Sequence, residues 1–386
     1  MTDPTLHARL HDHIGAIDAT RWDACAGTGN PFVSHAFLKA LEDSGCVVPE
    51  TGWLPQHLTL HGPGGTIDGV MPLYLKSHSQ GEYVFDHGWA DAFMQAGGRY
   101  YPKLQCSVPF SPVTGPRLMA APDVADPLGT RRALTDAARA ATEKLGVSSL
   151  HVTFAPEDQW KILGDAGFLL RVDQQFHWLN DGYQSFDDFL AALSSRKRKA
   201  IRRERRDALA DGIEVRTLTG NDITEAHWDA FHDFYMDTGL RKWGRPYLNR
   251  DFFSLLGERL GERVVLALAF RNGRAIAGAL NLCGDDTLYG RYWGCREDHP
   301  FLHFELCYYR AIDYAITHGL KRVEAGAQGP HKLARGYLPT PTFSAHWIEH
   351  PGLRDAVARF LERERRLVSN DMAALGDYSP FRRNED

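Results

Sequence analysis

Two stretches of this chain repeat each other at a fixed distance, and this duplication limits the folds that the chain can adopt. Gly167-Phe168-Leu169 precedes His177-Trp178, and Gly336-Tyr337-Leu338 precedes His346-Trp347, with a constant offset of 169 residues. Self-similarity over a long period indicates repeated structural units. The chain has 386 residues, whereas one domain usually has about 100–200. Two copies of one unit are therefore expected.

The segments before these stretches carry the same order of elements. Residues 67–73 and 85–89 alternate apolar and polar positions around a loop, and residues 276–282 and 289–294 do so around a Gly-Asp-Asp turn. Such alternation beside a turn rich in Gly and Asp is typical of a β-hairpin. We therefore expect one hairpin in each half, with residues 85–89 as the second strand of the first.

Each hairpin is followed by an amphipathic helix that ends near a glycine and leads into a strand. The first helix is predicted over residues 131–144, before Gly146. The second is predicted over residues 301–318, before Gly319 and a strand over 321–326. A glycine just after the last helical turn is a common signal for the end of a helix. The pattern predicts an α/β fold.

The predicted organisation is a first domain over residues 1–178, a second over 179–350, and a C-terminal helix and tail over 351–386. With 43% hydrophobic and 24% charged residues, the composition is that of a globular protein. The sequence has no apolar run of the length that a transmembrane helix needs. The N-terminus lacks a basic stretch followed by an apolar run, so a cytoplasmic location is expected.

The element order resembles the GNAT acyltransferase fold, in which two central strands splay apart and an acyl donor lies in the gap. Here these strands would be 287–294 and 321–326. Tandem GNAT units resemble the Fem-type transferases, which add amino acids from aminoacyl-tRNA to peptidoglycan precursors. More closely, four stretches resemble a bacterial FemAB-like family named for peptidoglycan biosynthesis or recognition: YPKLQCSVPFSPVTGPRL, SSRKRKAIRRERR, HFELCYYRAIDYAITHGLKRVEAGAQGPHKLARGYLP and SAHW.

This resemblance implies tandem GNAT-like domains, each with a mixed central sheet flanked by helices, and a transferase that moves an acyl or aminoacyl group to an amine. A cell-envelope precursor would be the acceptor. Residues 326–337 loosely resemble the F-K-x-x-F tail of Fem-type enzymes, in which a lysine faces the donor's ester. On that match Lys332 would stabilise the oxyanion, with His331, Arg335 and Tyr337 as substrate-binding neighbours. The alternative is that these charges lie on a solvated loop.

The donor is constrained by a missing motif. GNAT enzymes that use acetyl-CoA hold its pyrophosphate in a [QR]-x-x-G-x-[GA] loop at the start of the central helix. The equivalent segment, residues 294–305, has one glycine together with acids and a proline. This departure favours aminoacyl-tRNA or another carrier-bound acyl group over acyl-CoA. The donor is a co-substrate, and no permanently bound cofactor is expected.

Two carboxylates are candidates for the general base. Glu305 shares a predicted helix face with Phe301, Tyr308 and Ile312, and an apolar environment would raise its pKa toward the range that suits a base. The alternative for Glu305 is an acid in the first helical turn that is stabilised by the helix dipole. Glu324, on the adjacent strand, is the second candidate.

The positions of further residues in the predicted strands and loops make them candidates for substrate contact. Arg291 lies between Tyr289 and Trp293, and substrate contact by Arg291 and Trp293 is expected, with core packing as the alternative. In the first half, Lys103 and Arg117 border a loop rich in Pro and Gly that either lines an acceptor pocket or sets a turn.

No metal site is predicted. His299 and His303 are four residues apart but lack a third ligand at a convincing spacing, so we interpret them as capping and packing residues. The six cysteines include no C-x-x-C pair, which favours reduced thiols over a zinc site or a disulfide framework.

The strongest charge feature is a basic run within a predicted helix over 194–207. Eight of the eleven residues from 196 to 206 are Lys or Arg, in a chain whose net charge is −5. Such density favours an anionic ligand, with tRNA, a nucleotide-sugar diphosphate or a lipid headgroup as candidates. The alternative is a solvated linking helix. The predicted anion-binding residues are Arg196, Arg198, Lys199, Arg202 and Arg203.

These observations favour an N-acyltransferase that moves an aminoacyl or acyl group to an amine acceptor. Two alternatives stay open: an acetyl-CoA-dependent N-acetyltransferase with an altered pyrophosphate site, and a non-catalytic protein that binds RNA or an envelope precursor. Nothing in the sequence indicates an oligomeric state.

Overall fold

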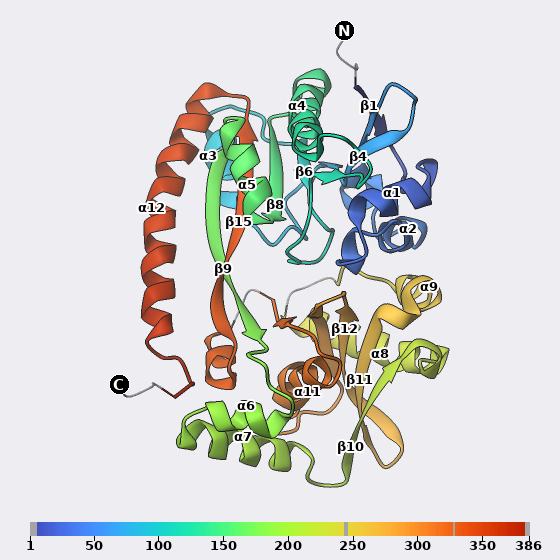
Figure 1. Ribbon diagram of the computed structural model, residues 1–386, viewed down its shortest axis with the longest axis vertical. Helices are drawn as coiled ribbons and strands as arrows, with labels where there is room; N and C mark the ends of the chain where they lie inside the picture. The colour runs from blue at the N-terminus through green and yellow to red at the C-terminus, as the bar shows by residue number, and fades with distance from the viewer. Residues whose placement is uncertain (1–5, 243–245, 327–328, 383–386) are drawn as a thin grey trace. The chain divides into compact units, whose positions relative to one another are not determined.

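The computed structural model describes residues 6–242, 246–326 and 329–382. The chain forms two compact units. Unit 1 contains residues 1–173 and 341–369, and unit 2 contains residues 174–340 and 370–386 (Figure 1). Two of these boundaries fall inside the strands β9 (Leu169–Leu179) and β15 (Leu338–Ile348), so each of these strands contributes residues to both units. The domain boundaries at 178 and 350 stay predictions.

Unit 1 contains one antiparallel four-stranded sheet and a second set of strands. The first sheet has the order β1-β3-β4-β7. In the second set, β2, β5 and β6 pair antiparallel, β6 pairs parallel to β8, and β8 pairs antiparallel to residues 343–348 of β15. The strands are β1 His7–His11, β2 Trp53–Pro55, β3 His57–His61, β4 Ile67–Met71, β5 Tyr74–Lys76, β6 Lys103–Cys106, β7 Met119–Ala120 and β8 Ser149–Ala155.

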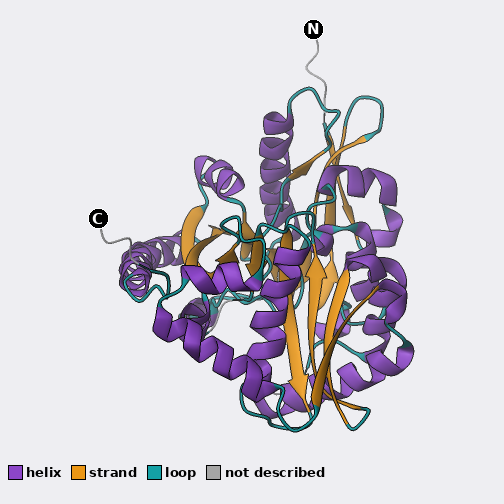
Figure 2. Ribbon diagram, turned by 60° about the horizontal axis from the view of Figure 1, so that its bottom comes forward, coloured by secondary structure: helices purple, strands orange, loops and turns teal. Residues whose placement is uncertain are grey.

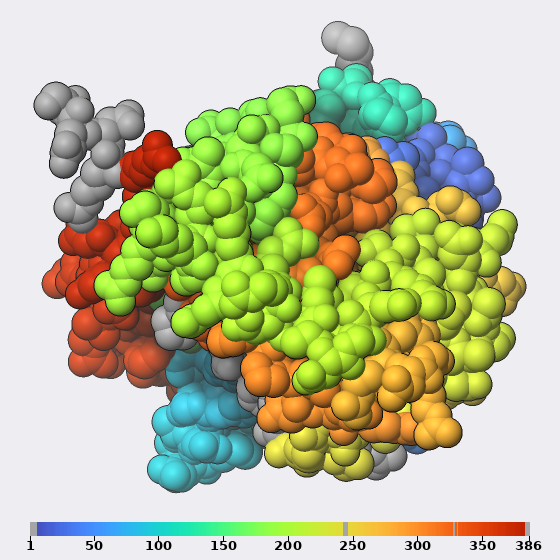
Figure 3. Space-filling view, turned by 90° about the horizontal axis from the view of Figure 1, so that it is seen from below, coloured from blue at the N-terminus to red at the C-terminus, as the bar shows by residue number. Residues whose placement is uncertain are grey.

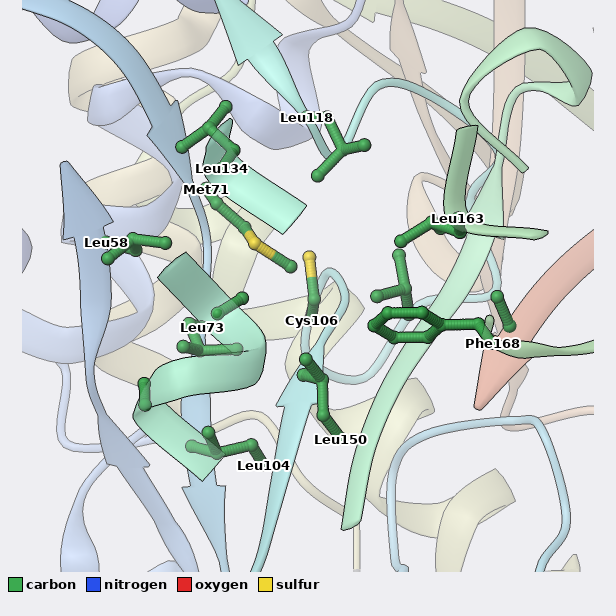
Figure 4. Close-up of a cluster of buried hydrophobic side chains, with 14 of the residues drawn as sticks. Leu58, Met71, Leu73, Leu104, Cys106, Leu118, Leu134, Leu150, Leu163 and Phe168 are labelled. Carbon is green, nitrogen blue, oxygen red and sulfur yellow. The ribbon is translucent and has the colours of Figure 1, made fainter. Parts of the chain in front are cut away.

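The helices of unit 1 cover these strands and enclose an apolar core. They are α1 Ala19–Ala26, α2 His35–Asp43, α3 His87–Gln95, α4 Pro127–Leu145, α5 Glu157–Asp165 and the first part of α12 Pro351–Gly376. Leu134 of α4 packs with Met71, Cys106 and Leu150 in the core that Figure 4 shows. As predicted, α4 ends at Gly146, which adopts a left-handed conformation with φ of 62°.

The prediction of a strand over residues 85–89 is wrong, because helix α3 begins at His87, with Asp86 as the residue just before it. Strand β4 pairs with β3 and β7 and not with residues 85–89, so the predicted first hairpin does not form. The sequence after Asp86 explains the helix: Trp89 and Phe93 are four residues apart and both pack against the start of α12, and apolar residues at that spacing form one helix face.

Unit 2 is built on a mixed sheet with the order β10-β11-β12-β13-β14-β9. Only the β13–β14 pair is parallel. The predicted second hairpin is confirmed, since β12 and β13 are adjacent and antiparallel. The strands that lie wholly in unit 2 are β10 Ile213–Thr219, β11 Val264–Arg271, β12 Arg274–Cys283, β13 Thr287–Cys295 and β14 Arg322–Glu324.

Helices flank the strands of unit 2 (Figure 2). Alternate residues of β12 face opposite sides: Gly278 approaches Phe231 of α8, whereas Ala277 and Ala279 pack with Leu302 and Leu306. The helices are α6 Phe186–Ala192, α7 Ser195–Ala208, α8 Glu225–Lys242, α9 Arg250–Leu260, α10 Leu302–Phe304 and α11 Arg310–Thr317, and α12 ends in this unit.

The helix predicted over residues 301–318 is present but not regular. Between α10 and α11 lies a π-helical turn, Glu305–Tyr309, called here the π turn. Phe301, just before α10, has a φ of 65°, which is strained for a bulky residue. Single π-helical turns occur mostly within α-helices and often at functional sites, and regular helical spacing from the sequence does not reveal them.

Two general features of the described residues bear on function. The described residues contain no disulfide bond, so all six cysteines are thiols. Within the described part of the chain, none of the helices has the length and apolarity that a membrane span requires.

The packing of β13 on α8 leads to a testable prediction. A Cβ atom added to Gly294 would lie 2.2 Å from the carbonyl oxygen of Phe234, so the backbone must move. We expect Gly294→Ala to lower the free energy of unfolding by about 3 kcal/mol, at the upper end of overpacking effects. Gly376→Ala is the control, because a Cβ there meets nothing within 4 Å. Urea unfolding of both variants tests this, and equal stabilities would contradict it.

Candidate functional site

The candidate site is a pocket of about 240 Å³ in unit 2. Its walls come from β12, β13, the residue after β14, the π turn, and a 3-10 helical turn, Pro330–Arg335, called here the 3-10 turn. The lining residues are Ala279, Leu280, Asn281, Gly290, Arg291, Tyr292, Trp293, His303, Cys307, Tyr308, Ala325, His331 and Lys332. Four of the predicted site residues, Arg291, Trp293, His331 and Lys332, are therefore brought together.

The pocket lies where two neighbouring strands separate. The described ladder between β13 and β14 has three residue pairs and ends at Tyr289 and Glu324, although β13 continues to Cys295. This is the position of the predicted splay. A β-bulge lies at the same place, since Asn281 of β12 faces Gly290 and the preceding Leu280 faces Tyr292. Bulges are common beside active sites, where they redirect a side chain.

The residue at this bulge is Arg291, which spans the gap. Its Nη2 donates to Glu324 Oε2 at 3.1 Å, and its Nη1 donates to the carbonyl oxygens of Gly290 and Glu324 at 2.9 and 3.2 Å. Both side chains of this ion pair are at most 1% exposed. Arg291 therefore lines the pocket as predicted but holds the separated strands in place, and Glu324 is its counter-ion.

Lys332 lies across the opening, in the 3-10 turn. Its Nζ donates to the carbonyl oxygens of Ala325 and Gly326 at 2.6 and 3.0 Å, and the residue is 4% exposed. Burial lowers the pKa of Lys332; with a raising effect of Cys307 and a smaller lowering effect of Arg291, this pKa is about 8. The lysine is therefore a buried pocket residue and still mainly protonated at neutral pH, and the alternative of a solvated loop charge is excluded.

His331 and Tyr308 form a pair in the same pocket. The His331 Nε2 and the Tyr308 hydroxyl are hydrogen-bonded at 2.9 Å. Burial lowers the pKa of His331, and the cations Lys332 and Arg335 lower it further. Burial also raises the pKa of Tyr308 well above its usual value. At neutral pH the pocket therefore holds a neutral imidazole beside a neutral phenol. The imidazole of His331 is the group that can accept a proton.

Arg335 and Tyr337, predicted to bind substrate, lie behind the pocket wall. Arg335 donates to the His331 carbonyl oxygen at 2.7 Å and to Glu204 Oε2 at 2.8 Å, and its guanidinium lies 3.4 Å from the ring centroid of Phe304. Tyr337 is fully buried and donates to the Tyr308 carbonyl oxygen at 3.4 Å. Both residues support the two turns that carry the pocket side chains.

The apolar environment predicted for Glu305 is wrong. Glu305 is fully buried, but its carboxylate accepts hydrogen bonds from Arg205 Nε and Nη2, each at 3.1 Å, and from Arg310 Nε at 2.9 Å. The π turn changes the helical phase after Glu305, so a face drawn with regular α-helical spacing does not exist. The general-base role of Glu305 stays a prediction.

The basic helix α7 has one buried side and one exposed side. Ile201 and Ala208 are its buried residues. Four of the five predicted anion-binding residues are exposed and Arg198 is partly buried. Figure 3 views the molecule from the side on which α6 and α7 lie at the surface. The exposed basic residues of α7 are Arg196, Lys199, Arg202, Arg203 and Arg206.

In unit 1, the predicted substrate contact Lys103 is enclosed. It is fully buried and its Nζ donates to Ser79 Oγ at 2.8 Å, to Glu82 Oε2 at 2.7 Å and to the carboxylate of Asp86. Arg117 is also fully buried and donates to four backbone carbonyl oxygens. These bonds favour the alternative that the loop is structural, and substrate contact by Lys103 stays a prediction.

His299 and His303, interpreted from the sequence as capping and packing residues, have different surroundings. His299 pairs with Glu297 at 2.9 Å, whereas His303 lines the pocket with its ring 5.1 Å from that of Trp293. The described residues contain no group of three or more His, Cys, Asp or Glu that could hold a metal ion. Sequence reasoning also missed Asn281, Cys307 and Tyr308 as pocket residues. The last two lie in the π turn, which regular helical spacing in the sequence does not reveal.

Comparison with known proteins identifies the family and the fold. A family model named FemAB-like and described as peptidoglycan biosynthesis/recognition matches residues 13–383. The crystal structure of FemX matches with a TM-score of 0.55 and 14% identity, over 89% of this chain and 98% of that chain. The predicted α/β fold of tandem GNAT-like units is confirmed.

Two further solved structures share this fold. The C-terminal domain of a putative lysylphosphatidylglycerol synthetase from Agrobacterium fabrum matches with a TM-score of 0.55 and 10% identity, over 90% of this chain and 96% of that one. L-PGS from Bacillus licheniformis matches with a TM-score of 0.51 and 8% identity, over 83% and 95%. No curated protein sequence matches this chain.

The buried pair beneath the pocket leads to a second prediction. We expect Glu324→Gln to lower the free energy of unfolding by about 3–5 kcal/mol, because it leaves the buried Arg291 guanidinium without its counter-charge. Glu297→Gln is the matched control. Glu297 pairs with Arg271 at 2.7 Å with both side chains about one-third exposed, so its loss should have a much smaller effect on stability. Denaturant unfolding measures both, and a small effect at position 324 would contradict the prediction.

Proposed function

Because this chain belongs to the FemAB-like family, we propose that it is an acyltransferase that moves an aminoacyl or acyl group from a carrier to the amine of an acceptor. The reaction takes place in the pocket at the β13–β14 splay. The observation that carries this proposal is Lys332, a buried cation that lines a pocket between separated strands. The family description favours a cell-envelope precursor as the acceptor. A tRNA-borne donor is found in the cytoplasm, so we propose a cytoplasmic location.

Lys332 is suited to stabilise the reaction intermediate. When an amine attacks an ester carbonyl, negative charge develops on the carbonyl oxygen, and a preorganised donor in a site with little water stabilises it strongly. The Lys332 ammonium has three N–H groups, of which two are held by the carbonyl oxygens of Ala325 and Gly326. These two bonds fix the direction of the third N–H, which is the donor proposed for the oxyanion.

His331 is the proton acceptor that the pocket geometry favours. The attacking amine must lose a proton, and a neutral imidazole within the pocket can take it. His331 lines the pocket and its pKa is lowered, so it stays neutral at physiological pH. Glu305, the base predicted from the sequence, is already bonded to two guanidinium groups and does not belong to the described pocket lining. We therefore place His331 before Glu305 in this role.

The donor proposed is aminoacyl-tRNA. The one glycine of residues 294–305, Gly294 near the end of β13, is explained by its contact with α8 rather than by a phosphate cradle. A donor without a cradle must be held elsewhere, and the exposed cations of α7 offer sites for the phosphates of a nucleic-acid carrier. An acyl-CoA donor and a non-catalytic binding function are the two outcomes that the following experiment distinguishes from this proposal.

The purified protein is incubated with bulk tRNA charged with radiolabelled amino acids, or with radiolabelled acetyl-CoA, in the presence of a membrane-free extract of peptidoglycan precursors. Transfer to an amine yields an amide, which survives mild base, whereas the starting ester does not. We expect base-stable label from aminoacyl-tRNA. Label from acetyl-CoA alone would replace the donor, and no transfer from either would support the binding-protein alternative.

Replacement of Lys332 tests the role of its charge. We expect Lys332→Met to lower kcat by about 10²–10³-fold, the usual cost of removing one oxyanion donor. Lys321→Met is the control, because Lys321 is 79% exposed and lies outside the pocket. Thermal unfolding of both variants separates a catalytic loss from misfolding. Activity of a folded Lys332→Met protein close to that of the wild type would overturn the role.

The pH dependence of kcat/KM tests both residues. Activity requires protonated Lys332 and neutral His331. The value of kcat/KM should therefore decrease at alkaline pH, above about 8, as Lys332 loses its proton. It should also decrease at acid pH, below the usual histidine pKa, as His331 gains a proton. Lys332→Arg should remove the alkaline limb from the measurable range, because arginine stays protonated. His331→Gln should remove the acid limb and lower the rate by about 10²–10⁴-fold. Unchanged limbs in these variants would contradict the assignments.

A further inference from the structure

Helix α7 presents two different faces. At about 100° per residue, its exposed cations Arg196, Lys199, Arg202, Arg203 and Arg206 fall within an arc of about 120° and extend over about 15 Å. We call these five residues the outer stripe. The buried Ile201 and Ala208 lie on the opposite side. Between these two sides, the neighbouring residues Glu204 and Arg205 point into unit 2.

Arg205 holds the π turn. Its Nε and Nη2 donate to Glu305, the first residue of that turn, and its Nη2 also donates to Asp313 at 2.6 Å. Its guanidinium lies 4.3 Å from the ring centroid of Phe186. The π turn carries Cys307 and Tyr308, which line the pocket, so Arg205 fixes one pocket wall from the outside.

Glu204 holds the 3-10 turn as well as the π turn. Its Oε2 accepts a hydrogen bond from Arg335 Nη2 at 2.8 Å and another from the Tyr309 hydroxyl. Arg335 in turn bonds the carbonyl oxygen of His331. Two adjacent residues of one helix therefore support both turns: the 3-10 turn, which carries Lys332 and His331, and the π turn, which carries Cys307 and Tyr308.

The isolated helix is poorly stabilised. Lys199 and Arg203, and Arg202 and Arg206, are like charges four residues apart, which disfavours a helix. Arg202 and Arg206 have exposed acidic partners, Asp187 and Asp207. For Arg196, Lys199 and Arg203, no ion pair exists within the described residues. A bound polyanion would relieve this repulsion.

We propose that the phosphate backbone of an RNA carrier binds the outer stripe, stabilises α7, and thereby orders the π turn and the 3-10 turn through Arg205 and Glu204. The inference rests on the proposed function and adds that the donor's carrier assembles the active site. Glu204 and Arg205 are positioning residues in this scheme.

A nucleic acid fits the outer stripe better than a membrane does. Helices that lie on membranes combine basic residues with an apolar face that enters the lipid. The buried apolar residues of α7 instead pack within unit 2, and the outer stripe contains only cations. A row of cations matches the regularly spaced charges of a phosphate backbone, and its affinity should fall steeply with salt.

Cys307 reports on the order of the pocket without any catalysis. It lies in the π turn and lines the pocket, so its alkylation rate depends on how often that turn opens. Binding that favours the ordered state must slow alkylation by the factor that couples the two sites, typically 5- to 150-fold. Peptide-resolved mass spectrometry measures this rate for Cys307 separately from the other five cysteines.

The experiment alkylates the full-length protein with and without bulk uncharged tRNA at low salt. We expect tRNA to slow the alkylation of Cys307 at least 5-fold, and moderate salt to abolish the effect. The triple variant Arg196→Gln, Lys199→Gln and Arg203→Gln should lose both tRNA binding and protection.

Two conservative variants separate the two faces of the helix. Arg205→Lys keeps the charge of α7 but loses the forked contact with Glu305, so tRNA should still bind within about twofold while the protection of Cys307 disappears. Arg203→Lys makes the same change on the outer stripe and should keep both. We call the variants at Glu204 and Arg205, which contact the two turns, the inner variants. Glu204→Gln retains an acceptor oxygen and is the milder of the two, for use if Arg205→Lys fails to fold.

Each outcome has a distinct meaning. Binding of tRNA without protection of Cys307, or protection that survives in both inner variants, would overturn the coupling and leave the proposed function intact. Absence of tRNA binding would overturn the RNA donor together with this inference. Protection by vesicles of anionic phospholipid, but not by tRNA, would identify a lipid surface as the ligand of the outer stripe and also overturn the inference.

Discussion

Where two strands of a sheet separate, the backbone groups that they release must find other partners, since an unpaired buried carbonyl is costly. In unit 2, side chains provide them. Arg291 donates to the carbonyl oxygens of Gly290 and Glu324, and Lys332 donates to those of Ala325 and Gly326. The residues that make the opening stable are thus the residues that line it. The pocket's chemistry follows from this constraint, because the replacement donors are cations.

The first repeat solves the same problem differently. In unit 1, β6 and β8 form a parallel ladder of three residue pairs, as β13 and β14 do in unit 2. The chain after Cys106 is buried here: Val108 and Phe110 are enclosed, and Arg117 donates to the carbonyl oxygen of Thr153 on β8. Unit 1 also has a pocket, of about 190 Å³, but its lining includes Pro102 and Ser148, which precede β6 and β8 rather than follow them. The two units therefore differ at the ends of the corresponding strands, and the candidate catalytic residues lie in unit 2.

The sequence predicted features that depend on local spacing. The β12–β13 hairpin and the glycine at the end of α4 follow from patterns within a few residues. The position of the splay, and Lys332 with His331 beside it, were implied by the resemblance to the GNAT and Fem-type families. The differences come from tertiary contacts. Glu305 lies among guanidinium groups because the π turn breaks the helical period, and Lys103 is enclosed because Glu82 and Asp86, distant in sequence, surround it. Helix α3 begins at His87, within the predicted strand 85–89, because Trp89 and Phe93 lie at helical spacing and pack against the start of α12.

The charges of unit 2 show where an anion can be bound. Inside, the cations have counter-ions: Arg291 has Glu324, Arg205 has Glu305 and Asp313, and Arg335 has Glu204. Lys332 differs, since its hydrogen bonds within the described residues go to neutral carbonyl oxygens only. Its charge is therefore not cancelled by its partners. In the part of unit 2 that the structure describes, positive charge without a counter-ion therefore lies in the pocket at Lys332 and along the outer stripe of α7, the two places where the proposed acyl transfer from a nucleic-acid carrier would need it.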